Sequence, residues 1–438
     1  MNSLSLKRRV ISLAVPAALK QLLDIVQLVI DMLMVGTLGI AALAAVGLSM
    51  QFMMLVQTLM SLYVVGGSAV IARYVGSGRY SRAGSVVYVA GIMAFLLSCI
   101  IMGIGYYGAE HFFRWMGSDA EVVHLGSTYF GILSLGMSLI FLDTLAFSAL
   151  SAAGDTKSSL YIKIFSACLN AGLNYLFIFG HGGFEAMGIA GAAYATLCAY
   201  AFSLAAYGVL FYRGKRLRIL PVIQWQDVQR IFTIGMPAVA ERFIGISAFL
   251  IFVWMIASYG TAALAGYQVG ARIEAFAFMP GYGFSVAAMV LTGQYLGAKQ
   301  TENAYAAGVL SAKIAMGFMG SVGVILILIP EYLSSFFTQD RATIEQASLY
   351  LRLVGLTQVP LALSFVISGA LRGAGATGTT LRINTISMWV FRILPAGLVV
   401  YTGMPIVGVY LAMGIETFIK GAWLWHIYRQ RQWLSKTF

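Results

Sequence analysis

The sequence predicts an all-α integral membrane protein, with twelve transmembrane helices in two pseudo-symmetric six-helix lobes. Of its 438 residues, 60% are hydrophobic and only 10% are charged, whereas soluble domains carry roughly 25% charged residues. Apolar runs long enough to cross a bilayer recur along the whole chain. The second half also repeats motifs of the first, which indicates two copies of one membrane module.

The internal repeat is read from matched segments 221 residues apart. Residues 14–47 correspond to residues 235–268, with Pro16 on Pro237 and Gly39 on Gly260. The same offset relates further segments, 74–76 with 295–297 and 150–154 with 371–375. Because the register holds without a gap over about 140 residues, it indicates an internal duplication.

The predicted spans follow from bilayer thickness. A hydrocarbon core of about 30 Å needs ~20 apolar residues per helix. Twelve runs fit: 10–35, 44–72, 86–107, 125–151, 160–180, 189–212, 231–257, 264–295, 304–329, 345–370, 381–402 and 406–427. We expect Pro16 and Pro237 near the starts of their helices, where proline is tolerated or bends the first turn. Pro280, Pro360 and Pro395 fall in mid-span, where they should kink or open the helix.

The orientation follows from the basic residues of alternate loops. Eighteen lysines and arginines lie in the termini and even-numbered connections, against Arg114 and Arg341 on the opposite side. The positive-inside rule therefore places both termini in the cytoplasm. The longest cytoplasmic connection, 212–230, joins the halves, so the predicted lobes are 1–218 and 219–438. A parallel repeat of this kind is typical of secondary transporters.

Several function classes are excluded by what the sequence lacks. Its net charge of +12 comes from short loops between apolar runs, which is a topology signal, so no nucleic-acid partner is expected. No phosphate-binding loop, metal-ligand spacing of the four histidines or nucleophile motif is present. We therefore expect neither an enzyme nor a cofactor, and transport would depend on an ion gradient.

Six acids lie inside the predicted spans. Because an ionisable side chain is costly to bury in a membrane, each of them is a candidate functional residue. They are Asp24, Asp31, Asp143, Glu241, Glu274 and Glu416. Glu416 precedes Lys420 by four residues, and Lys20 precedes Asp24 by four, so both are predicted to form helical ion pairs. These two pairs are interpreted as structural.

Asp31 differs because no basic residue lies three or four positions away. It shares one helical face with Asp24 and Gln27. The fifth span offers a matching polar face, made of Lys163, Ser166, Asn170 and Asn174. A carboxylate there could load and release a proton, or bind Na⁺ when ionised. The alternative is a structural aspartate that is permanently protonated or hydrogen-bonded.

Asp143 in the fourth span and Glu274 in the eighth remain open. Each could belong to a substrate cavity or to a buried structural network. Arg352 and Arg392 in the second half are predicted as their counter-charges.

Several stretches together resemble the multidrug and toxic compound extrusion (MATE) family, most closely its DinF-type branch. They are LVIDMLMVGTLGIAALAAVG, ALSAAGDTK, NAGLNYLFIFG, GIAGAAYAT and RIEAFAFMPGYGFSVAAMVLTGQYLGAKQ. The resemblance implies twelve helices in two lobes around a central cleft. It also implies export of amphiphilic, often cationic compounds in exchange for H⁺ or Na⁺.

The resemblance also assigns residues. Asp31 matches the family's helix-1 acid, which couples transport to the cation, with Asn170 and Thr196 beside it. Asn174 is a departure, because DinF-type members usually carry an aspartate there. Gly245 stands where the NorM branch has its helix-7 acid, so the second-lobe cation site of that branch looks missing.

The sequence therefore predicts a cation-coupled multidrug antiporter of the bacterial inner membrane, monomeric and driven by H⁺, with Na⁺ at Asp31 as the alternative. Its partners would be small organic cations and the lipid bilayer. The coupling residues would be Asp31, Asn170, Asn174 and Thr196. Candidate cavity residues are Gln27, Asp143, Glu274, Met279 and Tyr282, and Pro16 and Pro237 would bend their helices. A lipid-linked precursor flippase of the same superfamily is the main alternative, and a channel or structural membrane protein is the third class.

Overall fold

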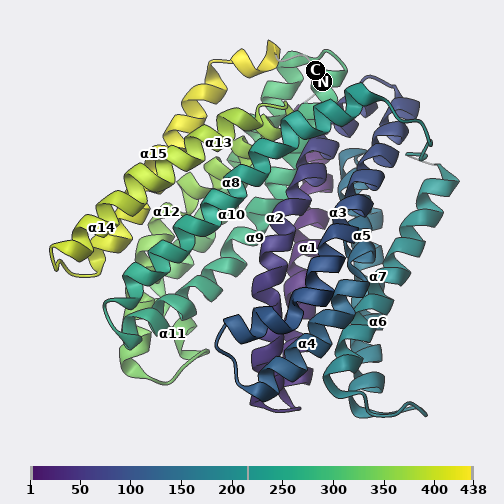
Figure 1. The fold of residues 1–438 in the computed structure, drawn as a ribbon. Helices are drawn as coiled ribbons and strands as arrows, with labels where there is room; N and C mark the ends of the chain where they lie inside the picture. The colour runs from purple at the N-terminus through teal and green to yellow at the C-terminus, as the bar shows by residue number, and fades with distance from the viewer. Residues whose placement is uncertain (1–2, 215–216, 436–438) are drawn as a thin grey trace. The chain divides into compact units, whose positions relative to one another are not determined.

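The computed structural model describes residues 3–214 and 217–435. Two residues of the predicted interlobe connection, Lys215 and Arg216, lie outside this range. In the described part, eleven helices are long and apolar enough to cross a membrane, and one bent pair forms a twelfth candidate (Figure 1). The chain is thus an all-helical, multi-pass membrane protein, as predicted.

The helices follow the predicted order. The first repeat contains α1 (Ser3–Gly36), α2 (Ile40–Gly76), α3 (Tyr80–Trp115), α4 (Ala120–Leu135), α5 (Met137–Ala152), α6 (Thr156–Phe179) and α7 (Gly188–Arg213). The second contains α8 (Trp225–Ala257), α9 (Thr261–Gly297), α10 (Thr301–Leu328), α11 (Pro330–Ser335), α12 (Arg341–Gly373), α13 (Thr377–Ile386), η1 (Ser387–Ile393), α14 (Leu394–Tyr401), α15 (Val407–Arg429) and η2 (Gln432–Ser435). The matched glycines of the repeat, Gly39 and Gly260, both have positive φ (124° and 102°) immediately before α2 and α9. This backbone conformation favours glycine.

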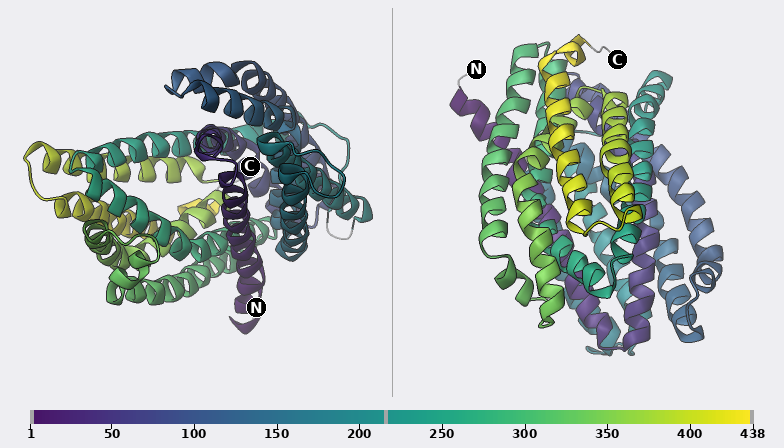
Figure 2. Two further views of the ribbon diagram at one scale, coloured as in Figure 1. Left: turned by 90° about the horizontal axis from the view of Figure 1, so that it is seen from below. Right: turned by 90° about the vertical axis from the view of Figure 1, so that its left-hand side faces the viewer.

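The chain divides into two compact units, Leu19–Gly235 and Met1–Ala18 with Met236–Phe438. In the Leu19–Gly235 unit, α6 and α7 pack closely, because Gly191 lets α7 approach the backbone of Phe177. In the other unit, α12 packs against α9, α10 and α15. There α14 and α15 form a hairpin, shown from two further sides in Figure 2. Close helix approach at glycine is the usual device of membrane helix packing.

The fourth span is broken, although its apolar run 125–151 predicts one continuous helix. α4 and α5 meet at Gly136 at an angle of 55°. A side chain at Gly136 would overlap Leu197 of α7. The glycine thus allows close packing against α7 at the bend, a tertiary requirement that apolar periodicity does not reveal.

The mid-span prolines behave differently from one another. α9 and α12 continue through Pro280 and Pro360 without a break, so the helices do not open there. A kink at these two prolines stays a prediction. Pro395 instead is the second residue of α14, which directly follows the π-helical segment η1. Because proline has no backbone N–H, each helix lacks one backbone hydrogen bond at its proline, and at Pro395 this coincides with a π-helical turn.

Pro16 and Pro237 lie in helix interiors, which corrects the expectation that they stand near helix starts. α1 begins at Ser3 and α8 at Trp225, well before the apolar runs. Both helices extend because residues ahead of the apolar runs also pack on the protein, burying side chains such as Leu6 and Asp227. Helix length is therefore decided by tertiary contacts as well as by hydropathy.

Candidate coupling site

The polar face of α1 contacts the polar face of α6, as the sequence predicts. Asp24, Gln27 and Asp31 are all partly buried on α1. On α6, Lys163 reaches Asp24 and Gln27, and Asn174 reaches Asp31. Polar side chains in a membrane protein require such partners, because lipid offers none.

Asp31 lies at one end of a hydrogen-bonded chain that joins α1, α6 and α7. Asn174 Nδ2 donates to Asp31 Oδ1 over 2.5 Å and to Asn170 Oδ1 over 3.3 Å. Asn170 Nδ2 donates to Thr196 Oγ1 over 3.5 Å, and Thr196 donates to the Ala192 carbonyl over 3.0 Å. The structure therefore brings the four predicted coupling residues together.

This series of hydrogen bonds leaves one acceptor oxygen without a partner beside Asp31. Asn170 and Asn174 are fully buried, and Asn174 Oδ1 has no hydrogen-bond partner in the described part of the chain. Both Asn174 donations come from Nδ2, so its oxygen remains for a further donor or a cation. The local oxygens are a carboxylate, two amide carbonyls and a hydroxyl, a donor set that suits hard cations or a proton.

Asp24 has a very different environment. Lys20 Nζ lies 2.8 Å from Asp24 Oδ2 and Lys163 Nζ lies 2.8 Å from Asp24 Oδ1. Lys163 also donates to Gln27 Oε1 over 2.5 Å. The predicted Lys20–Asp24 pair is confirmed, and Lys163 is an additional partner that only the tertiary fold supplies. A cation binding at Asp24 would have to displace two ammonium groups.

Asp143 and Glu274 accept hydrogen bonds from neutral groups. Ser203 Oγ of α7 donates to Asp143 Oδ1, and Tyr350 OH of α12 donates to Glu274 Oε2 over 2.5 Å. The predicted counter-charges are wrong as ion-pair partners. Arg352 pairs with Glu331 at 2.6 Å, and Arg392 pairs with Glu416 at 2.6 Å.

The two remaining cavity candidates on α9 differ in exposure. Met279 is 6% exposed, whereas Tyr282 is 42% exposed. They lie on the same helix as Glu274, in the unit that includes Met236–Phe438. Gln27 thus lies in the same unit as Asp31, Leu19–Gly235, whereas Glu274, Met279 and Tyr282 lie in the other unit.

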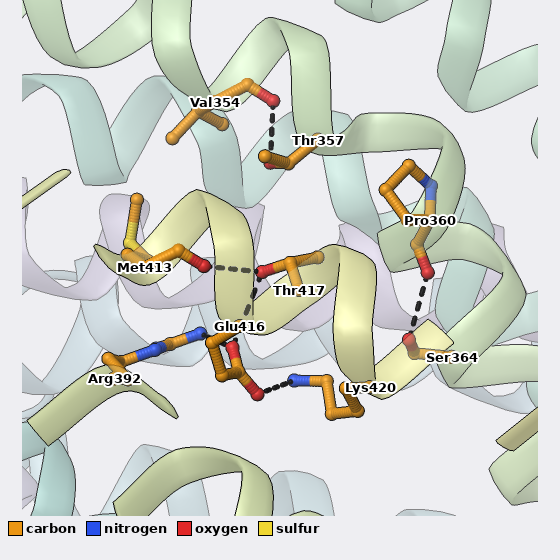
Figure 3. A network of polar contacts seen from close by, with 9 residues as sticks. All are labelled: Val354, Thr357, Pro360, Ser364, Arg392, Met413, Glu416, Thr417 and Lys420. Atoms are coloured by element: carbon orange, nitrogen blue, oxygen red, sulfur yellow. Dashed lines mark hydrogen bonds and ion pairs between the residues drawn. The ribbon is translucent and has the colours of Figure 1, made fainter. Parts of the chain in front are cut away.

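Glu416 lies in an ionic cluster of the unit that includes Met236–Phe438 (Figure 3). Arg392 Nη2 donates to its Oε2 over 2.6 Å, Lys420 Nζ lies 3.0 Å from its Oε1, and Thr417 donates over 3.4 Å. Glu416 is fully buried. The sequence predicted Lys420 from helical spacing but missed Arg392, which lies on the π-helical segment η1.

A second network, around Glu241 of α8, was also missed. Its carboxylate accepts from Arg372 of α12, from Thr380 Oγ1 over 2.9 Å and from Asn384 Nδ2 over 2.7 Å. These partners stand more than 130 residues away in the sequence. Repeat alignment offers one usable signal, because Lys20 and Glu241 are matched positions that both hold ionic clusters.

Comparison with known proteins supplies the family. The MatE family model matches residues 16–176 and 237–398. The probable multidrug resistance protein NorM of Thermotoga maritima is 28% identical over 413 residues, covering 93% of this chain and 89% of that protein. The uncharacterized transporter YisQ of Bacillus subtilis is 26% identical over 414 residues, covering 93% and 90%.

Solved structures agree on the fold. An outward-facing multidrug resistance MATE family transporter of the MOP superfamily superimposes with a TM-score of 0.90 at 23% identity, covering 99% of this chain and 97% of that one. A MATE structure in the straight conformation gives a TM-score of 0.89 at 24% identity, with the same coverage. The DinF-type assignment stays a prediction. Since the family model matches most of both repeats, the chain belongs to the MatE family of membrane transporters.

Proposed function

We propose that this protein is a cation-coupled antiporter that exports amphiphilic, mostly cationic organic compounds, with Asp31 as the residue that carries the coupling ion. H⁺ is the proposed ion, and Na⁺ is the alternative. The protein would act as a monomer in the bacterial inner membrane. Its relatives named as probable multidrug resistance proteins support drug export.

The environment of Asp31 carries this proposal. Asp24, Glu241 and Glu416 are each paired with a lysine or an arginine, so binding a further cation there means breaking an ion pair. Asp31 instead accepts from a neutral amide, next to the unpartnered Asn174 oxygen. Asp143 and Glu274 also accept from neutral donors, but only Asp31 has an unpartnered amide oxygen next to it among the described residues. We therefore infer that Asp31 is the acid best placed to exchange its cation during a cycle.

Coupling follows from reciprocity. If cation binding at Asp31 weakens substrate binding, substrate must weaken cation binding by the same factor. Cation exchange at Asp31 would change the conformation of α1, the helix that carries both Asp31 and Pro16. A proline inside a helix removes one backbone hydrogen bond and makes bending there less costly.

The proposed orientation places both termini in the cytoplasm. Its support is the asymmetry of basic residues between alternate loops. Export would then move substrate away from the side of the termini while the coupling cation moves toward it.

Reconstitution tests the function directly. Liposomes that contain the purified protein are loaded with ethidium, a fluorescent organic cation. Either a pH gradient or a Na⁺ gradient is then imposed across their membrane. We expect efflux driven by the pH gradient alone and abolished by a protonophore. Efflux driven by Na⁺ alone would keep the antiporter and change the ion. Flux that persists without any gradient and does not saturate would instead indicate a channel.

The flippase alternative depends on a cationic cavity. Three basic residues inside the spans could supply such a cavity, Arg352, Arg392 and Lys163, but all are engaged with acids: Glu331, Glu416 and Asp24. Their charges are therefore compensated locally. Transfer of a fluorescent lipid-linked pyrophosphate between leaflets, without ethidium efflux, would favour the flippase over the antiporter.

A further inference from the structure

The connection between the repeats is packed on the start of α3. Any side chain on Gly84 would overlap the backbone carbonyl of Arg218. The Leu220 N–H donates to the Gly84 carbonyl over 3.4 Å. All of these residues belong to the unit Leu19–Gly235. The connection therefore lies directly beside the turn that joins α2 to α3.

The first turns of α8 are packed on the end of α2 in the same unit. Arg230 Nη1 donates to Tyr74 OH over 2.6 Å and lies 3.2 Å from Asp227 Oδ1. Asp227 is fully buried and is the only acid of residues 217–235. Because Arg230 compensates its charge, this acid leaves the other arginines nearby without a counter-charge.

Three exposed arginines gather at this place, and we call them the arginine cluster. Arg79 and Arg82 lie at the start of α3, and the Arg218 carbonyl lies against Gly84, two residues after Arg82. In the described part of the chain, none of the three side chains forms a hydrogen bond or an ion pair. Residues 73–84 contain no acid. The arginine cluster therefore carries uncompensated positive charge.

Exposed apolar side chains lie between the two packed points of the connection. Val222 is 48% exposed, Ile223 is 62% exposed and Trp225 is 70% exposed. Trp225 is also the first residue of a candidate membrane span. Tryptophan and aliphatic side chains beside arginines suit the boundary between the hydrocarbon core and the headgroups of a membrane.

The second repeat makes the same turn without these arginines. The Arg79 N–H donates across the turn after α2 over 2.9 Å, and the Gln300 N–H, 221 residues later, donates across the turn after α9 over 2.8 Å. Arg82 likewise corresponds to Asn303, and the matched residues 294–305 contain one lysine and one glutamate, whose charges cancel. The turn itself therefore does not require the arginines. The predicted topology puts both turns on one side of the membrane, so orientation alone does not account for the difference.

We propose that Arg79, Arg82 and Arg218 bind the phosphate group of an anionic phospholipid, with Ile223 and Trp225 against its glycerol backbone and acyl chains. Guanidinium groups form paired hydrogen bonds with phosphate oxygens, and basic residues next to spans attract anionic headgroups. A zwitterionic headgroup carries its own ammonium and gains less from the same arginines. This site goes beyond the proposed function, because it involves neither the transported substrate nor the coupling ion.

Competition between two lipids tests the proposal. The full-length protein in detergent is mixed with equal amounts of phosphatidylglycerol and phosphatidylcholine that have the same acyl chains. Native mass spectrometry then counts the lipids of each kind that the protein retains. The site variant combines Arg79→Gln, Arg82→Gln and Arg218→Gln.

The control variant combines Arg8→Gln, Lys299→Gln and Arg429→Gln, which remove three exposed basic side chains that also lack an acidic partner in the described part of the chain. We expect the site variant to lose at least about tenfold of the wild-type preference for phosphatidylglycerol, because each basic residue near an anionic headgroup contributes roughly fivefold. The control variant should keep that preference. An equal loss in both variants would indicate unspecific charge attraction and overturn the site, and so would an unchanged preference in the site variant.

Inorganic phosphate distinguishes a phospholipid site from a site for a free anion. Added in excess over the lipid, it should displace no more phosphatidylglycerol from the wild type than sodium chloride of the same ionic strength does, because it gains nothing from the apolar side chains. Displacement by phosphate beyond the sodium chloride control would overturn the assignment to a phospholipid.

Tryptophan fluorescence in nanodiscs locates the bound lipid. Brominated acyl chains quench the tryptophans that they contact, and the difference between the wild type and Trp225→Phe isolates the contribution of Trp225. We expect brominated phosphatidylglycerol to quench this contribution more strongly than brominated phosphatidylcholine does, and the site variant to remove the difference. Equal quenching by both lipids in the wild type would contradict the proposal. Since no transport is measured, lipid binding as expected without any efflux would contradict only the proposed function.

Discussion

A carboxylate inside the membrane needs partners, and Glu416 and Asp31 show two different solutions. Glu416 is enclosed by Arg392 and Lys420, whereas Asp31 accepts from the neutral amide of Asn174. A buried ion pair is costly to break because an uncompensated charge remains. The first arrangement suits a permanent structural charge, and the second suits an acid whose charge is exchanged.

Removing the Glu416 charge should destabilise the protein strongly. We expect Glu416→Gln to lower the free energy of unfolding by about 3–5 kcal/mol, because two partly buried cations lose their fully buried acid. Glu331→Gln is the control, since Glu331 also pairs with an arginine but is 53% exposed. An exposed pair is worth about 0–1 kcal/mol. Equal shifts of both variants in equilibrium unfolding would contradict the structural role of the Glu416 cluster.

Asn174 should tune cation affinity at Asp31. Asn174→Asp places a second carboxylate beside the first, and a charge so close should strengthen Na⁺ binding by at least about tenfold. The measurement is Na⁺-dependent thermal stabilisation of the purified protein. Asn303→Asp, at the start of α10, controls for the added charge. Identical Na⁺ responses in wild type and Asn174→Asp would remove Asn174 from the coupling site.

At the scale of single elements, glycine contacts decide where spans bend. Gly136 and Gly131 lie in the same broken span, yet a methyl group at Gly136 meets Leu197 and one at Gly131 meets nothing within 4 Å. We therefore expect Gly136→Ala to cost about 1–3 kcal/mol by overpacking. Gly131→Ala should be close to neutral in the same unfolding assay. The opposite ranking would contradict the account of the bend.

Elements also show what the sequence could and could not predict. Apolar length and the repeat predicted the position of the candidate spans but not the break in the fourth, because bilayer thickness constrains only helix length. Helical spacing correctly paired Glu416 with Lys420, and it correctly set the Asp31 face against the Asn170–Asn174 face. It could not find Arg392 or Ser203, whose contacts depend on the packing of distant helices. The helix starts that enclose Pro16 and Pro237 also depend on tertiary burial.

For the whole molecule, the distribution of basic residues predicts that both termini are cytoplasmic. A C-terminal green fluorescent protein fusion should therefore fluoresce, and a C-terminal alkaline phosphatase fusion should be inactive. Fusions after Arg114, in a loop of the opposite side, should give the reverse pattern. An active phosphatase at the C-terminus would invert the proposed orientation.

The central claim is that Asp31 exchanges the coupling cation, and one comparison tests it most directly. Efflux of ethidium from liposomes under a pH gradient is measured for wild type, Asp31→Asn and Glu110→Gln, an exposed acid of α3 that pairs with Arg114. We predict that Asp31→Asn abolishes gradient-driven efflux while remaining folded and that Glu110→Gln transports normally. Full activity of Asp31→Asn would contradict the claim and move the coupling site to Asp143 or Glu274, the other two acids held by neutral donors.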